Sequence, residues 1–87
     1  MSAAGSEHMP HFHLNVFDDI EAYDREGIQC PNIEEAKGKA IAGARELVAT
    51  SIIEGKPIYR SHRIEITNGC GEVLDTVRFA DIVDLRP

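Results

Sequence analysis

Three histidines are the first residues of this chain that could do chemistry. His11 and His13 are two positions apart in an alternating segment, so their side chains point to one strand face about 7 Å apart. His62 could join them, and three imidazoles can bind zinc. No cysteine or carboxylate completes the set at a recognisable spacing. The sequence thus predicts no metal or other cofactor and keeps His11, His13 and His62 as candidate ligands, against the alternative of two solvent-facing histidines on an edge strand.

The segment 56–63 is the only basic stretch. It holds three cations, a tyrosine and a histidine without an acid, and its candidate binding residues are Lys56, Tyr59, Arg60 and Arg63. Such a stretch can bind a phosphate, an acidic partner or single-stranded RNA, with bases stacked on the tyrosine. The alternative is a solvated linker whose cations balance the acidic remainder.

The densest acidic run does not have the spacing of a calcium-binding EF-hand loop. Its members are Asp18, Asp19, Glu21, Asp24 and Glu26. Nothing in the sequence around them indicates a pocket or a raised carboxyl pKa. We therefore expect a solvated hairpin and loop here.

The two cysteines predict reduced thiols and a cytoplasmic protein. Cys30 and Cys70 are far apart and form no CxxC pair. Cys30 stands just before a helix start, where a dipole can lower a thiol pKa, but a catalytic thiol also needs a histidine that the fold places beside it. We predict no catalytic residue, and hence no enzyme.

Length and charge limit the domain count and the partners. The 87 residues are 43% hydrophobic and 28% charged, with a formal net charge of −6, which suits one small globular domain. The acidic balance disfavours binding to duplex nucleic acid. No apolar stretch is long enough for a membrane span. Residues 1–8 are small and polar, so we expect a leader or disordered tail there and one domain over 9–87.

Hydrophobic periodicity predicts the elements. Period two indicates a strand over 11–17, with a short return strand over 20–24. A helix starts after Asn32, and Gly55 ends it. Two further strands flank Asn68-Gly69, a hairpin signal. The predicted fold is α+β, with a single helix packed on one face of a four-stranded antiparallel sheet in the order ββαββ.

Two details inside these elements bear on packing. The apolar stripe of the helix is small at its start and bulky near Leu47, so we expect Leu47 in the core. Asp75 shares its parity with the apolar residues of the last strand. Either a bulge intervenes, or Asp75 lies where the sheet face is uncovered.

Four motifs resemble a family of small proteobacterial single-domain proteins of unknown function. They read Met9-Pro10-His11-Phe12, Asp24-Arg25-Glu26-Gly27, the Pro-capped start of the Ala-rich helix at 31–36, and Val77-Arg78-Phe79 in the closing hairpin. The resemblance covers Met9 to about Leu85 and departs from the family at His11 and His13, where aromatic residues are common. It supports the fold and implies no catalytic residues.

The combined features predict a small cytoplasmic bacterial protein that acts as a non-catalytic protein-binding or regulatory module. The alternatives are a small metal-dependent protein or enzyme using the histidines, and a nucleic-acid-binding module using segment 56–63. We also expect a homodimer, because one helix cannot cover all the remaining apolar residues. These are Phe17, Ile58, Leu74 and Ile82.

Overall fold

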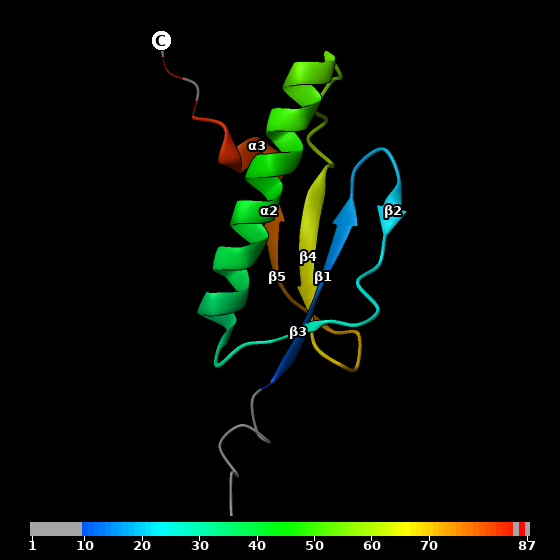
Figure 1. Cartoon of the computed structure of the whole chain (residues 1–87), viewed down its shortest axis with the longest axis vertical. Coiled ribbons are helices and arrows are strands. Elements are labelled where there is room, and N and C mark those ends of the chain that lie inside the picture. The colour runs from blue at the N-terminus through cyan, green and yellow to red at the C-terminus, as the bar shows by residue number, and fades with distance from the viewer. Residues whose placement is uncertain (1–9, 85, 87) are drawn as a thin grey trace, which may run out of the picture.

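The computed structural model describes residues 10–84 and 86, in which one long helix crosses an antiparallel sheet (Figure 1). The elements are β1 (His11–Phe17), β2 (Glu21–Ala22), β3 (Ile28–Gln29), α2 (Ile33–Glu54), β4 (Arg63–Thr67), β5 (Val73–Arg78) and α3 (Phe79–Ile82). The predicted α+β class is confirmed. The tail predicted for residues 1–8 lies outside the described residues.

The predicted strand count and the chain order ββαββ are wrong, because three strands precede α2 and a short helix, α3, follows β5. The sheet has five strands in the order β2-β1-β4-β5, and β3 also pairs with β1. The expected return strand over 20–24 is reduced to Glu21–Ala22, opposite Val16 and Phe17. The chain then leaves β1 and returns as β3, opposite the start of β1. β3 is therefore an additional strand in a segment where the sequence predicts a connection, and residues 23–27 separate it from β2.

The helix forms where its caps predict. Asn32 has extended backbone angles, and its side-chain oxygen accepts the Glu35 N–H at 2.9 Å. At the other end Gly55 adopts φ 71°, the left-handed conformation that glycine tolerates best, and its N–H reaches the Ile52 carbonyl. No helix among the described residues is long and apolar enough to cross a membrane.

Alanines bring α2 close to the sheet. Three alanines of the helix are completely buried: Ala36, Ala40 and Ala44. The helix packs mainly on β4 and β5 and makes fewer contacts with β1. The remaining core residues are Phe12, Cys30, Val48, Ile64, Ile66, Val77 and Phe79. The expectation for Leu47 needs correction: it is only partly buried beside this core, and the next residue, Val48, takes the buried position.

The last hairpin contains the bulge that the sequence left open as one of two alternatives, and Asp75 does not lie on an uncovered face of the sheet. Its register shifts between Ile66 and Thr67, which leaves Leu74 without an opposite residue. Asp75 lies opposite Ile66, on the face that carries α2, and its Oδ2 is 3.2 Å from Lys37 Nζ of that helix. The carboxylate is tolerated there because α2 supplies a cation and its side chain keeps 37% exposure.

Candidate functional site

Asp24 closes one edge of the sheet. Its Oδ2 accepts the Leu14 N–H at 3.2 Å, and its Oδ1 accepts the Gly27 N–H at 3.0 Å. Its own N–H donates to Asn15 Oδ1 at 2.9 Å. These bonds lie where residues 23–27 leave β1 and no strand ladder can form. Between β2 and β3, side chains therefore satisfy the hydrogen-bonding groups along the edge of β1. This protects that edge from pairing with a strand of another chain.

His11 and His13 pack against this loop. Gly27 has φ 73°, and an added Cβ would lie 2.9 Å from His11 Cδ2, His13 Cε1 and the Phe12 carbonyl oxygen. His13 Nδ1 donates to the Asp24 carbonyl at 2.6 Å. The two rings, whose centroids are 6.2 Å apart, therefore hold the Asp24–Gly27 loop against β1.

The third predicted ligand lies elsewhere. His13 faces Thr67, and His62 is five residues before Thr67 along the chain, about 17 Å away at 3.3 Å per residue. In the described part of the chain, no group of three or more His, Cys, Asp or Glu side chains could hold a metal ion. The structure brings His11 and His13 together and leaves His62 apart.

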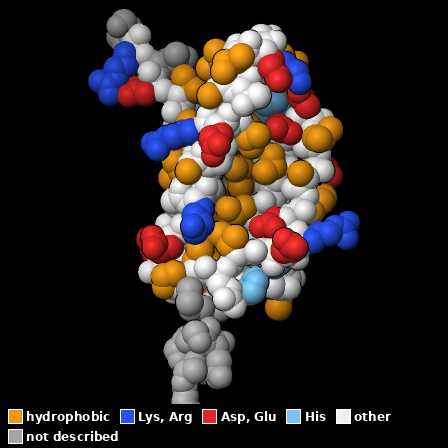
Figure 2. All heavy atoms as spheres, in the orientation of Figure 1, with side chains coloured by type: hydrophobic (Ala, Val, Ile, Leu, Met, Phe, Trp, Pro, Cys, Tyr) orange, Lys and Arg blue, Asp and Glu red, His pale blue; other side chains and the backbone are white. Residues whose placement is uncertain are grey.

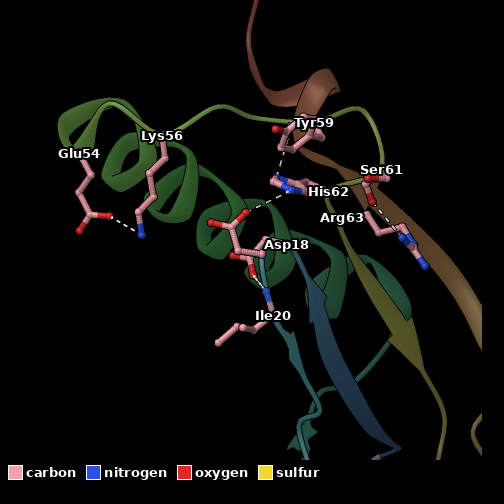
Figure 3. A network of polar contacts seen from close by, with 9 residues as sticks. Asp18, Ile20, Glu54, Lys56, Tyr59, Ser61, His62 and Arg63 are labelled. Atoms are coloured by element: carbon pink, nitrogen blue, oxygen red, sulfur yellow. Dashed lines mark hydrogen bonds and ion pairs between the residues drawn. The ribbon is translucent and has the colours of Figure 1, made fainter.

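His62 connects the linker after α2 to the core. It is 7% exposed, and its ring lies edge-on to both Tyr59 and Phe79, with centroids 5.3 and 5.9 Å away. Its Nδ1 accepts the Tyr59 N–H at 3.4 Å (Figure 3). Its Nε2 lies 3.8 Å from Asp19 Oδ1. These contacts stabilise the linker.

Two of the four candidate binding residues of segment 56–63 form ion pairs with acidic side chains. Lys56 pairs with Glu54 at 3.2 Å, and the two side chains point toward each other at the end of α2 (Figure 3). Arg63 pairs with Glu65 at 2.8 Å and lies over the Phe17 ring at 4.6 Å. Two glutamates just outside the segment thus neutralise two of its three cations. The composition of the segment alone does not predict these pairs. Tyr59 and Arg60 remain exposed.

Arg60 lines a cavity beside α3. Its volume is about 380 Å³, and its other walls are Ile58, Phe79, Ala80 and Val83. Ile58 also packs against the core, as does Ile82, so neither is the surplus apolar residue that the sequence predicts.

The remaining candidates have local roles. Asp18 Oδ1 accepts the Ile20 N–H at 3.2 Å and so shapes the turn after β1. Glu21 accepts the Tyr23 hydroxyl at 3.2 Å, and this bond raises the pKa of Tyr23. Cys30 is 1% exposed, which gives a substrate no access to its thiol.

The opposite edge of the sheet is open. Among residues 10–84 and 86, β5 pairs with β4 alone. The Phe79 N–H donates to the His62 carbonyl at 3.0 Å, and the next hydrogen-bonded pairs follow at every second residue, including Ile64 with Val77. By this alternation the backbone groups of Thr76 and Arg78 point outward.

A groove follows this open edge. It is a cavity of about 190 Å³ between α2, β5 and α3, and its apolar walls are Ile41, Val77 and Ile82. Its charged lining residues are Lys37, Arg78 and Asp81. A cavity of about 150 Å³ can hold a benzene molecule, so this one has room for a large apolar side chain.

The Asp75 carboxylate already accepts a hydrogen bond from one of the outward N–H groups of β5, that of Thr76. Its Oδ1 accepts the Thr76 N–H at 2.8 Å, while Lys37 holds its Oδ2. The Thr76 hydrogen bond, followed by Lys37, lowers the pKa of Asp75 below its usual value. A strand that adds to β5 must displace this carboxylate. In the sequence, Asp75 stands out because it alternates in phase with the apolar residues of its strand. Nothing in the sequence indicates that Lys37 pairs with it.

Comparison with known proteins places the chain in one family. The model of a domain of unknown function, DUF6894, matches residues 11–80. No curated protein and no solved structure matches the chain. The match spans β1 to the start of α3, including the Asp24 loop and both sheet edges. The family expected from the four motifs, one of small single-domain proteins of unknown function, is confirmed, and the chain belongs to the DUF6894 family.

Proposed function

We propose that this domain is a non-catalytic protein-binding module that takes an extended segment of its partner as an additional strand beside β5. The observation that carries this proposal is the contrast between the two edges. Asp24 and two short strands close the β1 edge, whereas β5 leaves outward backbone groups next to an apolar groove. Strand addition uses such an edge for main-chain hydrogen bonds and adjacent pockets for alternate side chains.

The alternatives from the sequence receive less support from the geometry. A metal-dependent function through the histidines requires His62 to approach His11 and His13, which lie toward the other end of the sheet. Nucleic-acid binding through segment 56–63 requires free cations, and two of its three cations are paired with glutamates. We also propose a cytoplasmic location, which suits two free thiols, one buried and one exposed.

Thr76→Pro tests strand addition. The substitution removes an outward N–H and leaves the ladder to β4 intact, a position where an edge strand tolerates proline. Seven-residue peptides selected from a random display library on the native protein should bind the variant about tenfold more weakly or worse, since one hydrogen bond is lost and the proline ring obstructs the edge. Isothermal titration measures both affinities.

Glu21→Ala is the matched control, because it changes an exposed residue at the closed edge. It should leave the affinity of the same peptides unchanged. Selected peptides that bind the Thr76→Pro variant as tightly as the native protein, or a library that yields no peptide, would contradict strand addition at β5.

The homodimer expected from the sequence is a separate proposal, and a different surface supports it. Figure 2 shows hydrophobic side chains gathered over the strands beside α2, where charged groups lie mostly around the rim. Leu14 and Val16 of β1 are only partly buried on this face, because α2 packs mainly on β4 and β5. A second copy can cover such a strip.

Sedimentation equilibrium tests the homodimer. At tens of micromolar protein, the mass should be about twice the 9.6 kDa of one chain. The Thr76→Pro variant should give the same mass, because the strip lies away from the β5 edge. A monomer mass over the whole concentration range would show that the strip does not join two copies.

A further inference from the structure

We propose that the β5 groove selects an antiparallel partner strand in which an acidic residue, an apolar residue, any residue and a basic residue follow one another. This inference rests on the proposed function and names the partner segment for that site. It follows from three features of the groove: the phase of its outward backbone groups, the position of its apolar walls and the charges beside them.

The phase of β5 sets which partner residue enters the groove. The backbone groups of Thr76 and Arg78 point outward and would bond to an added strand, so the partner residue between these two bonded positions lies opposite Val77. Opposite residues of paired strands point to the same face. Val77 faces α2, and its partner residue therefore points between Ile41 and Ile82. That position takes an apolar side chain.

We choose the antiparallel direction because every pair in this sheet is antiparallel. Antiparallel pairing is also slightly more stable per residue than parallel pairing. In this direction the partner residue before the apolar one lies opposite Arg78, and the residue two positions after it lies opposite Asp75.

Arg78 favours an acid. It lies directly opposite Arg63 in the β4–β5 pairing, so two cations already face each other across the strands. Glu65 holds the Arg63 guanidinium on one side, and Arg78 is exposed. An acidic partner residue on the outer side of Arg78 offsets this repulsion, since opposite charges on facing strands attract and like charges repel.

Asp75 favours a base. Addition of the strand gives the Thr76 N–H to a partner carbonyl, and the Asp75 carboxylate loses that 2.8 Å hydrogen bond. Lys37 then remains its only partner in the described structure. A basic partner residue opposite Asp75 replaces the lost interaction. The reversed charge order would place a base against Arg78 and an acid against Asp75.

Two capped seven-residue peptides test the charge order. Both contain one glutamate, one leucine and one lysine in a background of threonine, so their composition and net charge are identical. The first places glutamate before the leucine and lysine two positions after it, and the second exchanges the two charged residues. We expect the first to bind at least about tenfold more tightly, because both cross-strand charge pairs change sign. Amide chemical shifts of isotope-labelled full-length protein measure both affinities, with the largest shifts at Thr76 and Arg78.

Asp75→Ala tests the role of the carboxylate. It frees the Thr76 N–H and removes the charge that a partner base recognises. A third peptide with alanine at both charged positions should therefore bind this variant more tightly than it binds the native protein. The tenfold preference between the two charged peptides should also decrease, because only Arg78 remains to discriminate them.

The outcomes separate this inference from the proposed function. Equal affinity for the two charged peptides, with both weakened by Thr76→Pro, overturns the charge order and leaves strand addition intact. Binding that is insensitive to Thr76→Pro overturns both. A native dimer that Thr76→Pro converts to a monomer shows that the occupant of the edge is a second copy, and this result also overturns the selection of a separate partner strand.

Discussion

Replacing Phe79 with alanine is expected to lower the free energy of unfolding by about 3 to 5 kcal/mol. Phe79 is 1% exposed and is among the largest fully buried side chains of the described structure. Its ring packs edge-on to His62, so the cavity would also loosen the linker that follows α2. Urea unfolding monitored by circular dichroism measures the loss.

Val73→Ala is the control for this prediction. Val73 is also an apolar residue of the last hairpin, but it is 53% exposed. Its truncation should cost less than about 1 kcal/mol. Similar losses for Phe79→Ala and Val73→Ala would show that the ring does not fill a core position.

Replacing Gly27 with alanine is expected to lower the free energy of unfolding by about 2 to 4 kcal/mol, from backbone strain and overpacking together. Its φ of 73° is unfavourable for any residue with a side chain, and a Cβ would lie 2.9 Å from His11, His13 and the Phe12 carbonyl. The two rings can turn, but the carbonyl belongs to β1 and cannot move without disturbing the sheet. Hydrogen exchange at the Leu14 amide should become faster, because Asp24 would lose its position.

Gly55→Ala isolates the steric part of that loss. Gly55 has φ 71°, almost the same backbone conformation, but nothing lies within 4 Å of an added Cβ. It should therefore cost only the backbone strain, about 1 to 2 kcal/mol. If the two glycine variants lost equal stability, the close contacts of Gly27 would carry no energy, and the proposed role of His11 and His13 in holding the loop would be wrong.

The hydrogen bonds of Asp24 at the β1 edge could not be predicted from local sequence patterns. The alternation over 11–17 predicts β1, and the acids and glycine after it predict a turn and a loop. Period and composition do not reveal that the Asp24 carboxylate accepts the N–H groups of Leu14 in β1 and of Gly27 in the loop. The fifth strand, β3, was also missed, because it forms only where Ile28 and Gln29 meet the start of β1. The resemblance to the family named the Asp24–Gly27 motif without supplying its physical role.

The pairing of the candidate binding residues was missed for a related reason. Segment 56–63 is basic as a run, but Glu54 and Glu65 stand just beyond its ends and pair with Lys56 and Arg63. An isolated count of cations does not predict which of them are free. Similarly, the alternation that places His11 and His13 on one face cannot tell whether His62 approaches them, because that depends on the register between β1 and β4.

The sequence by itself determined the α+β class, the helix with its Asn32 and Gly55 caps, the closing hairpin and the family. These features depend on periodicity, capping and turn residues within a few positions of one another, and such short-range signals survive in any tertiary context. The open β5 edge and its groove were decided only by the tertiary structure. They depend on which strand lies outermost and on the position of α2 across β4 and β5, which places Lys37 beside Asp75 and Ile41 beside Val77. Contacts between residues so distant in the chain follow from how the whole core packs, and no local pattern contains them.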